Sequence, residues 1–281
     1  MARALGTAVE ELAVERIATS ARAEIDRITW RGPHGSGRLL FKRMHRAASL
    51  EAGLLPFLSR RRLPVERVVS SGIPPAHVRE PRPWVLTLEP EGAPLCAPAT
   101  RESARLAGEA LATIQRATRG DAGVLTALGV PTLSPSRIRD EAPASADLLG
   151  EEDAARLRSL SAGLDVSALD ALGLVLVHGA YDCARVLVAE GRPVALDWSR
   201  AHLGCPLEDV ARLHTDLARR GAAIAQEFLE GYGEDVATLG AARILGQLFD
   251  VRWLAWEASE GLRAREESAA LVRTILHLSG A

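Results

Sequence analysis

The chain of 281 residues contains no asparagine and a single lysine, Lys42, although lysine and arginine together number 34. Cysteine is scarce as well. Cys96, Cys183 and Cys205 lie far apart without the spacing of a metal site, which favours a reducing, cytoplasmic environment. Heavy use of Ala, Arg, Gly and Leu is typical of a GC-rich, actinobacterial genome, and that bias depletes both lysine and asparagine. The one lysine that remains is therefore a candidate functional residue.

Charge and hydropathy argue against two classes of partner. A net charge of −2 does not supply the concentrated positive surface that nucleic acids require. The one dense basic cluster, Arg60 to Arg62, is most simply the solvated end of a helix. No apolar run approaches the ~20 residues of a membrane span, and the mixed acidic and apolar N-terminus is no secretory signal. We expect a cytoplasmic protein whose partner is a small molecule.

Hydrophobic periodicity predicts an α+β protein whose first part is mostly β and whose second part is mostly helical. Lobes are expected at residues 1–91 and 92–281, with a hinge near 89–92. The predicted strands are 14–18, 24–30, 38–44, 65–70 and 84–88. The predicted helices are 7–12, 47–62, 101–118, 151–163 and at least three after Pro206. Residues 120–149, rich in Pro, Ser and Ala, are predicted to form a loop or lid.

The most informative segment lies between residues 174 and 198. An apolar strand leads into His178-Gly-Ala-Tyr-Asp-Cys-Ala-Arg185, and Ala195-Leu-Asp-Trp198 follows. This segment resembles the catalytic loop and metal-binding strand of the aminoglycoside phosphotransferase and choline kinase families. Their loop reads H-G-D-x-x-x-x-N, and a strand ending in I-D-W or L-D-W comes next. The resemblance covers nearly the whole chain and implies a two-lobed, protein-kinase-like fold.

Two chemical residues of that motif are missing. Ala180 stands where the family has its catalytic aspartate, and Arg185 stands where it has a metal-binding asparagine. A methyl group accepts no proton, and a guanidinium repels a metal cation. The resemblance therefore implies that Mg²⁺ binding is weakened or absent and that ordinary phosphotransfer is severely depressed.

The nucleotide-binding residues of the family are retained. Lys42, on a strand, and Glu51, on the following helix, match the pair that holds the α- and β-phosphates. The alternative is a surface lysine in an accidental position. The glycine-rich turn 33–37 joins the second and third strands and is rejected as a phosphate loop. The counterpart, residues 19–22, has no glycine, although Ser20 or Arg22 remain candidates for a phosphate contact.

Further positions take their expected roles from the resemblance. Asp197 corresponds to the surviving metal ligand, with a turn-forming aspartate as the alternative. His178 and Asp209 correspond to residues that support the loop. Glu89 lies in a segment similar to the hinge that meets adenine through its backbone. The implied cofactor is ATP or another nucleotide.

The acceptor side is less defined. Asp250, Trp253 and Glu257 fall on one helical face, where carboxylates beside an aromatic ring suit an amine-bearing or sugar-like ligand. The alternative, which we prefer, is an amphipathic helix whose tryptophans fill the core. Tyr181, in the altered loop, is a further candidate for the substrate pocket.

Three hypotheses of function remain. The first is a pseudoenzyme that binds a nucleotide or metabolite without phosphotransfer and that could act on a protein partner. The second is an active small-molecule phosphotransferase in which Asp182, two residues beyond Ala180, replaces the missing base. A displaced loop aspartate is more often a turn-former. The third is a repurposed enzyme of specialised metabolism that uses the same cleft for different chemistry.

Overall fold

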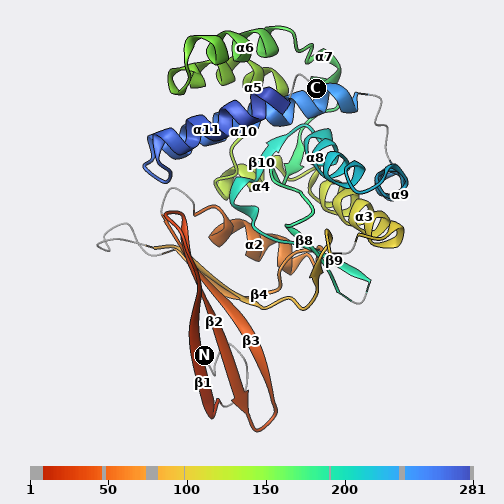
Figure 1. Ribbon diagram of the computed structural model, residues 1–281. Coiled ribbons are helices and arrows are strands. Elements are labelled where there is room, and N and C mark those ends of the chain that lie inside the picture. Colours follow the sequence, from red (N-terminus) through yellow and green to blue (C-terminus); the bar gives the residue numbers. More distant parts are fainter. Residues whose placement is uncertain are drawn as a thin grey trace. The chain divides into compact units, whose positions relative to one another are not determined.

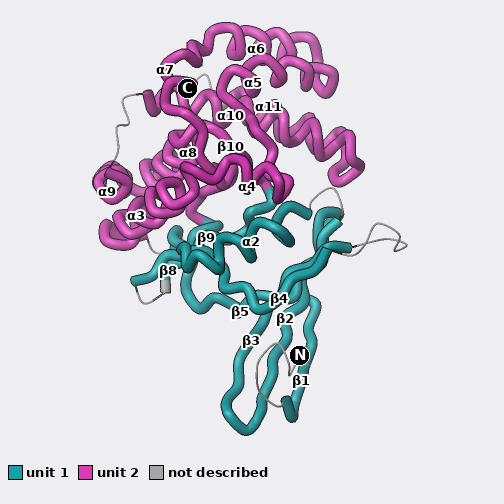
Figure 2. The backbone as a smooth tube through the Cα atoms, turned by 180° about the vertical axis from the view of Figure 1, so that it is seen from behind, with its two compact units in different colours: residues 1–98, 184–199 teal, residues 99–183, 200–281 magenta. Residues whose placement is uncertain are grey.

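A computed structural model describes residues 9–45, 49–73, 82–97, 99–189, 191–233 and 238–278. The chain divides into two compact units, residues 1–98 with 184–199 and residues 99–183 with 200–281 (Figure 2). The first unit is mostly β and the second mostly helical, which confirms the predicted α+β class. Within the described residues, no helix combines the length and the apolar character needed to cross a membrane.

A five-stranded antiparallel sheet, in the order β1-β2-β3-β5-β4, forms the frame of the first unit. The strands are β1 (Glu11–Thr19), β2 (Ala23–Gly32), β3 (Gly35–Met44), β4 (Val68–Gly72) and β5 (Trp84–Leu88). The ribbon of β1 to β3 extends past the ends of β4 and β5 (Figure 1). Lys42 of β3 lies opposite Ile25 of β2 and Val85 of β5, so the lysine is central in the sheet.

The two faces of this sheet differ, because successive side chains of a strand point to opposite sides. One face buries Ile28, Leu39 and Leu86, with several aromatic side chains packed against them. The other face carries Lys42. Helix α2 (Glu51–Arg60) contacts β4 and β5. It buries Leu54, Leu55 and Leu58, each worth ~2 kcal/mol of hydrophobic stabilisation, and this packing fixes the start of the helix.

A second, three-stranded sheet of the first unit consists of β6 (Ala93–Pro94), β8 (Val186–Ala189) and β9 (Arg192–Ala195). Val186 pairs with Ala195, and the Leu196 N–H donates a 2.9 Å hydrogen bond to the Arg185 carbonyl. The pairing of β8 and β9 therefore brings Arg185 next to Leu196 and Asp197, although they are separated by more than ten residues of sequence.

The second unit is built from helices around the short antiparallel pair β7 (Val175–Val177) and β10 (His202–Gly204). Helices α3 (Arg101–Thr118) and α9 (Ala222–Tyr232) pack closely at Gly108 and Gly231. A Cβ on Gly108 would lie 2.2 Å from the Phe228 carbonyl oxygen, and one on Gly231 would lie 2.0 Å from that of Arg105. Helix α10 (Leu239–Ser259) contacts α8 (Leu207–Ala218) and α11 (Arg265–Leu278). The helices expected after Pro206 are therefore confirmed.

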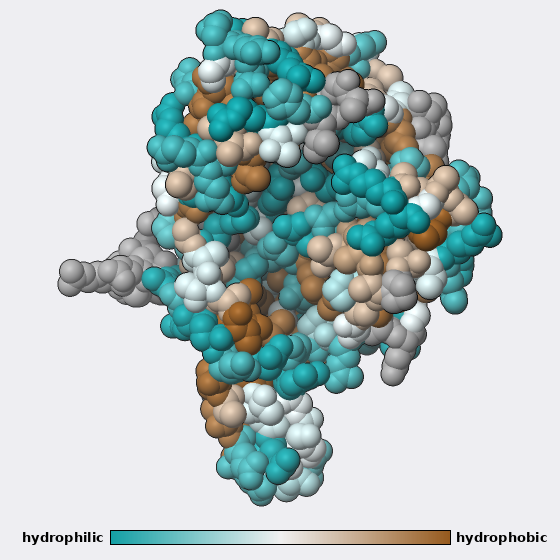
Figure 3. Space-filling view, in the orientation of Figure 1, coloured by the Kyte–Doolittle hydropathy of each residue, from teal (hydrophilic) through white to brown (hydrophobic). Residues whose placement is uncertain are grey.

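The helix predicted over residues 7–12 is wrong where the structure describes it. Residues 7 and 8 lie outside the described part, and Glu11 and Leu12 begin β1. Every residue of this edge strand is exposed, including Leu12 at 53% and Val14 at 60%. Apolar surface accordingly appears along the ribbon in Figure 3. An edge strand without a buried face lacks the alternation by which a strand is recognised in sequence.

The loop or lid predicted over residues 120–149 is also wrong. This stretch forms α4 (Ala122–Ala127), α5 (Pro135–Glu141) and the 3₁₀ helix η2 (Ala142–Leu148), and α6 (Glu151–Ala162) and α7 (Ser167–Asp170) follow. Pro135 occupies the first turn of α5, where its missing N–H costs nothing, and the Ser134 hydroxyl caps the Arg137 N–H. Proline and serine thus begin a helix here.

Candidate functional site

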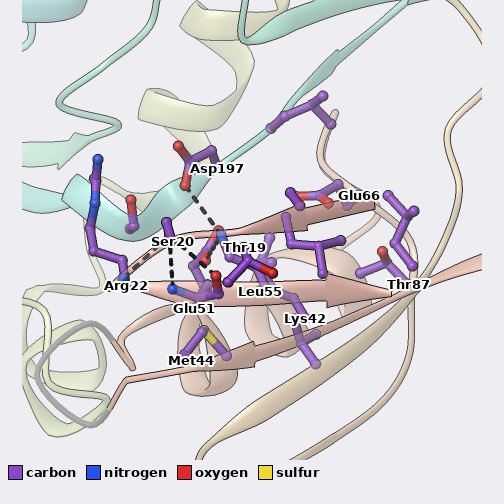
Figure 4. A pocket seen from close by; sticks show the side chains of 17 residues that line it. Thr19, Ser20, Arg22, Lys42, Met44, Glu51, Leu55, Glu66, Thr87 and Asp197 are labelled. Atoms are coloured by element: carbon purple, nitrogen blue, oxygen red, sulfur yellow. Dashed lines mark hydrogen bonds and ion pairs between the residues drawn. The ribbon is translucent and has the colours of Figure 1, made fainter. Parts of the chain in front are cut away.

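A pocket of about 350 Å³ lies within the first unit. Its apolar wall includes Ile25, Leu40 and Val85, which project from neighbouring strands. Its polar end carries one lysine and three carboxylates. These four groups are Lys42, Glu51, Glu66 and Asp197 (Figure 4). The β1–β2 turn closes another side of the pocket.

That turn, residues 19–22, contributes Thr19, Ser20 and Arg22 to the pocket lining. The Ser20 hydroxyl accepts the N–H groups of Arg22, at 3.3 Å, and Ala23, at 3.1 Å. Two N–H groups that a glycine-rich loop would point at a phosphate are thus bonded within the turn. The Arg22 side chain is the part of the turn that suits an anion.

Lys42 lies between two carboxylates. Its Nζ is ion-paired with Glu51 and lies 3.2 Å from Asp197 Oδ1. Burial alone would lower the pKa of Lys42, but the charges of Glu51 and Asp197 outweigh it and hold that pKa above the ordinary value. Glu51 Oε1 also accepts the Trp198 N–H at 2.8 Å. The lysine and glutamate that the sequence pairs are therefore together, and both are tied to the segment that bears Asp197.

Arg185 bonds the other oxygen of the same carboxylate. Its Nε lies 3.3 Å from Asp197 Oδ2, while Lys42 occupies the side of Oδ1. Both carboxylate oxygens of Asp197 therefore contact a protein cation. Arg185, at the position expected to carry the family's asparagine, thus bonds Asp197, at the position expected to carry its metal ligand.

The backbone of Asp197 is in the left-handed region, with φ of 62°. Few residues other than glycine adopt this conformation, which costs roughly 1–2 kcal/mol, and aspartate is among those that tolerate it. Strain of this kind persists only where the surrounding structure enforces it, as at ligand sites. The conformation directs the carboxylate toward Lys42 and Arg185.

The magnesium site that the family implies does not fit these residues. Mg²⁺ requires near-octahedral oxygen ligands, whereas the oxygens of Asp197 are engaged by Lys42 and Arg185. The family's asparagine oxygen has been replaced by a positive charge.

Glu66 is a pocket residue that sequence reasoning missed. Its carboxylate accepts the Asp197 N–H, and burial, together with the charge of Glu51, raises the pKa of Glu66 to about 8. It lies between the isolated bridge at Val65 and the start of β4. No sequence motif marks this position. Glu66 reaches the pocket because the neighbouring Val65 forms a bridge with Ala195, which is distant in sequence.

Glu89, expected at the nucleotide hinge, uses its side chain elsewhere. Its carboxylate accepts Arg27 Nε at 3.0 Å and Arg27 Nη2 at 2.8 Å, and it pairs with Arg38 Nε at 3.3 Å. Its N–H donates to the Arg38 carbonyl at 3.0 Å. Glu89 does not contribute to the pocket lining. This residue ties β2 and β3 to the end of β5.

The altered loop, in the second unit, has the support predicted from the resemblance. Asp209 of α8 is fully buried and accepts the N–H groups of His178, at 2.6 Å, and Gly179, at 3.0 Å. Burial raises the pKa of Asp209 to about 6, although the His178 N–H opposes this. Gly179 has φ of 75°, and a Cβ there would lie 2.4 Å from the Arg200 carbonyl oxygen. The backbone shape of the loop is intact.

Three side chains of the loop, those of Ala180, Tyr181 and Cys183, are buried. Ala180 is 1% exposed and presents a methyl group. Tyr181, equally buried, donates its hydroxyl to the Ala107 carbonyl at 2.9 Å, and burial raises its pKa above the ordinary value. Cys183 is also buried, and its N–H donates to Asp216 at 3.3 Å. Tyr181 thus uses its hydroxyl to hold the loop against α3.

Asp182 is partly exposed and lies in a network of charges. Burial would lower the pKa of Arg212, but Asp250, and more weakly Asp182, keep it raised. Arg212 donates to Asp250 at 2.9 Å, and Arg200 bonds the same oxygen. Asp182 is thereby linked electrostatically to residues of α8 and α10.

The three residues predicted to face an acceptor have internal partners. Asp250 bonds two arginines, as described above. The Trp253 indole donates to Glu257 at 2.8 Å, and Glu257, only 1% exposed, also accepts Arg263 Nε at 2.9 Å. A cavity of about 230 Å³ between α8, α10 and α11 is lined by Asp250 but by neither Trp253 nor Glu257.

These two units, one centred on an ion-paired lysine and the other on a loop held by a buried aspartate, define a protein-kinase-like fold. Residues 23–245 match the phosphotransferase enzyme family, APH, and the chain belongs to that family. No curated protein sequence matches the chain.

Solved structures share the fold at low sequence identity. Macrolide 2'-phosphotransferase MphH from Brachybacterium faecium is 21% identical, with 96% of each chain covered and a TM-score of 0.64. Spectinomycin phosphotransferase, APH(9)-Ia, is 15% identical, with 98% of this chain and 94% of the other covered and a TM-score of 0.61. Choline kinase from Cryptosporidium parvum Iowa II is 10% identical, with coverages of 96% and 89% and a TM-score of 0.63.

Proposed function

We propose that this member of the phosphotransferase family binds a nucleotide in the pocket of its first unit, while ordinary ATP phosphotransfer is lost or severely impaired. The observation that carries the proposal is the pair of contacts made by Asp197. Its carboxylate bonds Lys42 through one oxygen and Arg185 through the other. The carboxylate that would bind the metal is therefore occupied by two side chains of the protein.

Electrostatics explains why this contact opposes catalysis. Two unit charges 4 Å apart interact by about 4 kcal/mol at an effective dielectric constant of 20. A divalent cation doubles this, so Mg²⁺ beside Arg185 meets a repulsion of roughly 8 kcal/mol before water and salt screen it. Metal neutralisation of the transferring phosphoryl group is a main source of rate in this chemistry.

The loop of the second unit supplies no proton acceptor at the usual position. Ala180 is buried and its side chain is a methyl group. General-base assistance typically contributes 10²–10⁴-fold to a rate. The loss of the base and the loss of the metal site are separate obstacles, and together they account for a severe reduction.

The pocket itself suits a nucleotide. Ile25, Leu40 and Val85 form an apolar wall for a flat base, and Lys42 supplies a compact charge for phosphates at the other end. The structure of spectinomycin phosphotransferase contains ADP and spectinomycin. We propose the same class of ligand, a nucleotide with a small-molecule partner, for this chain.

The test is thermal stabilisation by ADP and ATP measured beside turnover. We expect a concentration-dependent rise in Tm with either nucleotide and no detectable ADP formation from ATP. Lys42→Ala removes the rise, whereas the matched control Arg192→Ala, at the exposed first residue of β9, leaves it unchanged. Transfer to an alcohol at a rate typical of active kinases would refute the proposal.

A second candidate function is an active phosphotransferase that uses Asp182 as the base. The observation in its favour is the charge network of Arg212 and Asp250, which restrains the surroundings of Asp182. If Asp182 is the base, Asp182→Ala abolishes product formation without a change in Tm. Turnover that survives this substitution would eliminate the role.

A further inference from the structure

The two cations that contact Asp197, a residue of the pocket lining, have an arrangement that the proposed function leaves unexplained. Asp197 holds Lys42 on one oxygen and Arg185 on the other. Loss of the asparagine alone would be enough to remove the metal site, and it does not require that the new residue bond Asp197. Arg185 instead lies beside the carboxylate that would bind a divalent cation, with a permanent positive charge.

We propose that the guanidinium of Arg185 takes the place of the divalent cation, so that a nucleoside di- or triphosphate binds this pocket without metal. This inference rests on the proposed function, because it concerns the phosphate end of the same site. It adds that nucleotide binding is independent of Mg²⁺, whereas metal chelation accompanies nucleotide binding in an ordinary kinase.

The chemistry of guanidinium suits this role. It carries five N–H donors in a planar fork, so one group can bond a carboxylate and a phosphate together. It stays charged at all ordinary pH values. The 3.3 Å bond from Arg185 Nε to Asp197 fixes one edge of the fork within the first unit.

The hairpin geometry fixes the position of this charge. Arg185 immediately precedes β8, and its carbonyl accepts the Leu196 N–H at 2.9 Å just after β9. The strand pairing of Val186 with Ala195 holds the backbone on both sides. Arg185 is also only partly exposed, at 33% of its side chain. Backbone hydrogen bonds therefore hold the residue from which the side chain projects, and the bond to Asp197 holds the guanidinium.

The pocket has a second reason to need an internal cation. Three carboxylates, those of Glu51, Glu66 and Asp197, line its polar end. Lys42 contacts Glu51 and Asp197 and cannot by itself offset the charges of both and of a polyphosphate. Arg185 and Arg22, which lines the pocket from the β1–β2 turn, supply the additional positive charge.

The experiment compares the Kd of ADP, measured by calorimetry with the full-length protein, in EDTA and in Mg²⁺. For the wild type we expect the two Kd values to agree within about threefold. Arg185→Asn restores the family residue and should weaken binding at least tenfold in EDTA, with recovery in Mg²⁺. Arg192→Asn, an exposed arginine of the same hairpin, is the matched control and should behave as the wild type.

A direct metal readout separates the alternatives. Bound Mn²⁺, followed by electron paramagnetic resonance in the presence of ADP, should be absent in the wild type and present in Arg185→Asn. Arg185→Lys keeps the charge without the fork and should bind ADP in EDTA with intermediate affinity. If Arg185→Asn fails to fold, the wild-type comparison and Arg185→Lys still decide the question.

Two outcomes overturn the inference in distinguishable ways. Wild-type binding of ADP that requires Mg²⁺ refutes metal independence but leaves nucleotide binding intact. No binding of ADP or ATP by the wild type in either buffer refutes both the inference and the proposed function.

Discussion

The two units keep different parts of the family's motifs. In the first unit the nucleotide-binding side chains Lys42, Glu51 and Asp197 all remain and contact one another, and an added arginine joins them. In the second unit the backbone support of the loop remains, from Asp209 to His178 and Gly179, but the reactive side chain is a buried methyl group. The residues expected to bind a nucleotide are kept, whereas the position of the expected base carries a methyl group.

The difference shows that the shape of such a loop and its reactivity depend on separate interactions. Hydrogen bonds that two N–H groups donate to the Asp209 carboxylate hold the loop whatever side chain follows Gly179. A buried acceptor of this kind stabilises the fold, so its loss is costly even in a protein without catalysis. The comparison predicts that supporting residues matter for stability and pocket residues for ligand binding.

The largest expected effect comes from removing the support of the loop. Asp209→Ala leaves the N–H groups of His178 and Gly179 buried without their acceptor, and each lost partner costs about 1–3 kcal/mol. We expect Tm to fall by roughly 4–24 °C, at about 2–4 °C per kcal/mol for a chain of this size. Calorimetry on purified protein measures the change.

The matched control is Asp140→Ala, an exposed aspartate of the same unit whose side chain is 63% accessible. It should change Tm by less than about 2 °C, since surface ion pairs contribute little. Equal effects of the two substitutions would mean that Asp209 does not support the loop, and the comparison between the units would break.

The sequence predicted those parts of the site that depend on residues close together in the chain. Lys42 on a strand and Glu51 on the following helix were paired from the resemblance, and the structure brings them together. Strand β2 and helix α3 followed from alternation and from an apolar face of helical period. These features are encoded within windows of about twenty residues.

The features that sequence missed depend on tertiary contacts. Glu66 lies in the pocket because Val65 bridges Ala195, more than a hundred residues away. The short helices over residues 122–148 owe their stability to packing more than to propensity, since isolated helices of six or seven residues do not persist. Asp197 in a left-handed conformation also left no local signal, because aspartate occurs in many turns.

The second prediction is a gain of phosphotransfer activity. It tests the missing base of the second unit and the missing metal ligand of the first unit together. The double substitution Ala180→Asp with Arg185→Asn restores the family residues at both altered positions. We expect ATP hydrolysis or transfer to rise by about 10²-fold or more over the wild type, because a base and a metal site are worth at least that. A coupled assay for ADP release measures it.

The single variants sharpen the comparison. Each should give less than the double variant, since a base without a metal, or a metal without a base, completes only one of the two missing functions. A double variant that folds, binds ADP with Mg²⁺ and still shows no activity would place the defect elsewhere in the chain. Added aspartate at the buried Ala180 position needs a check of Tm.

The smallest effect concerns pH and the first unit. Glu66 has a folded-state pKa raised from 4.5 to about 8 by burial and by Glu51. Between these values the folded protein keeps a proton that the unfolded chain has released. The stability contribution of Glu66 therefore falls as pH rises from about 4.5 to about 8, and it is constant outside that window. At ~1.4 kcal/mol per pKa unit, the total amounts to a few kcal/mol at most.

Glu66→Gln removes this titration while keeping a side chain of the same shape. Urea unfolding should show the wild type losing stability from pH 5 to pH 8.5 relative to the variant, whereas Glu91→Gln, an exposed residue of the same unit, follows the wild type. Parallel stability curves for the wild type and Glu66→Gln would show that Glu66 ionises normally. In that case the charge of Lys42 outweighs burial at this carboxylate, and the pocket holds three ionised carboxylates at neutral pH. Its dependence on Arg185 for anion binding would then be greater.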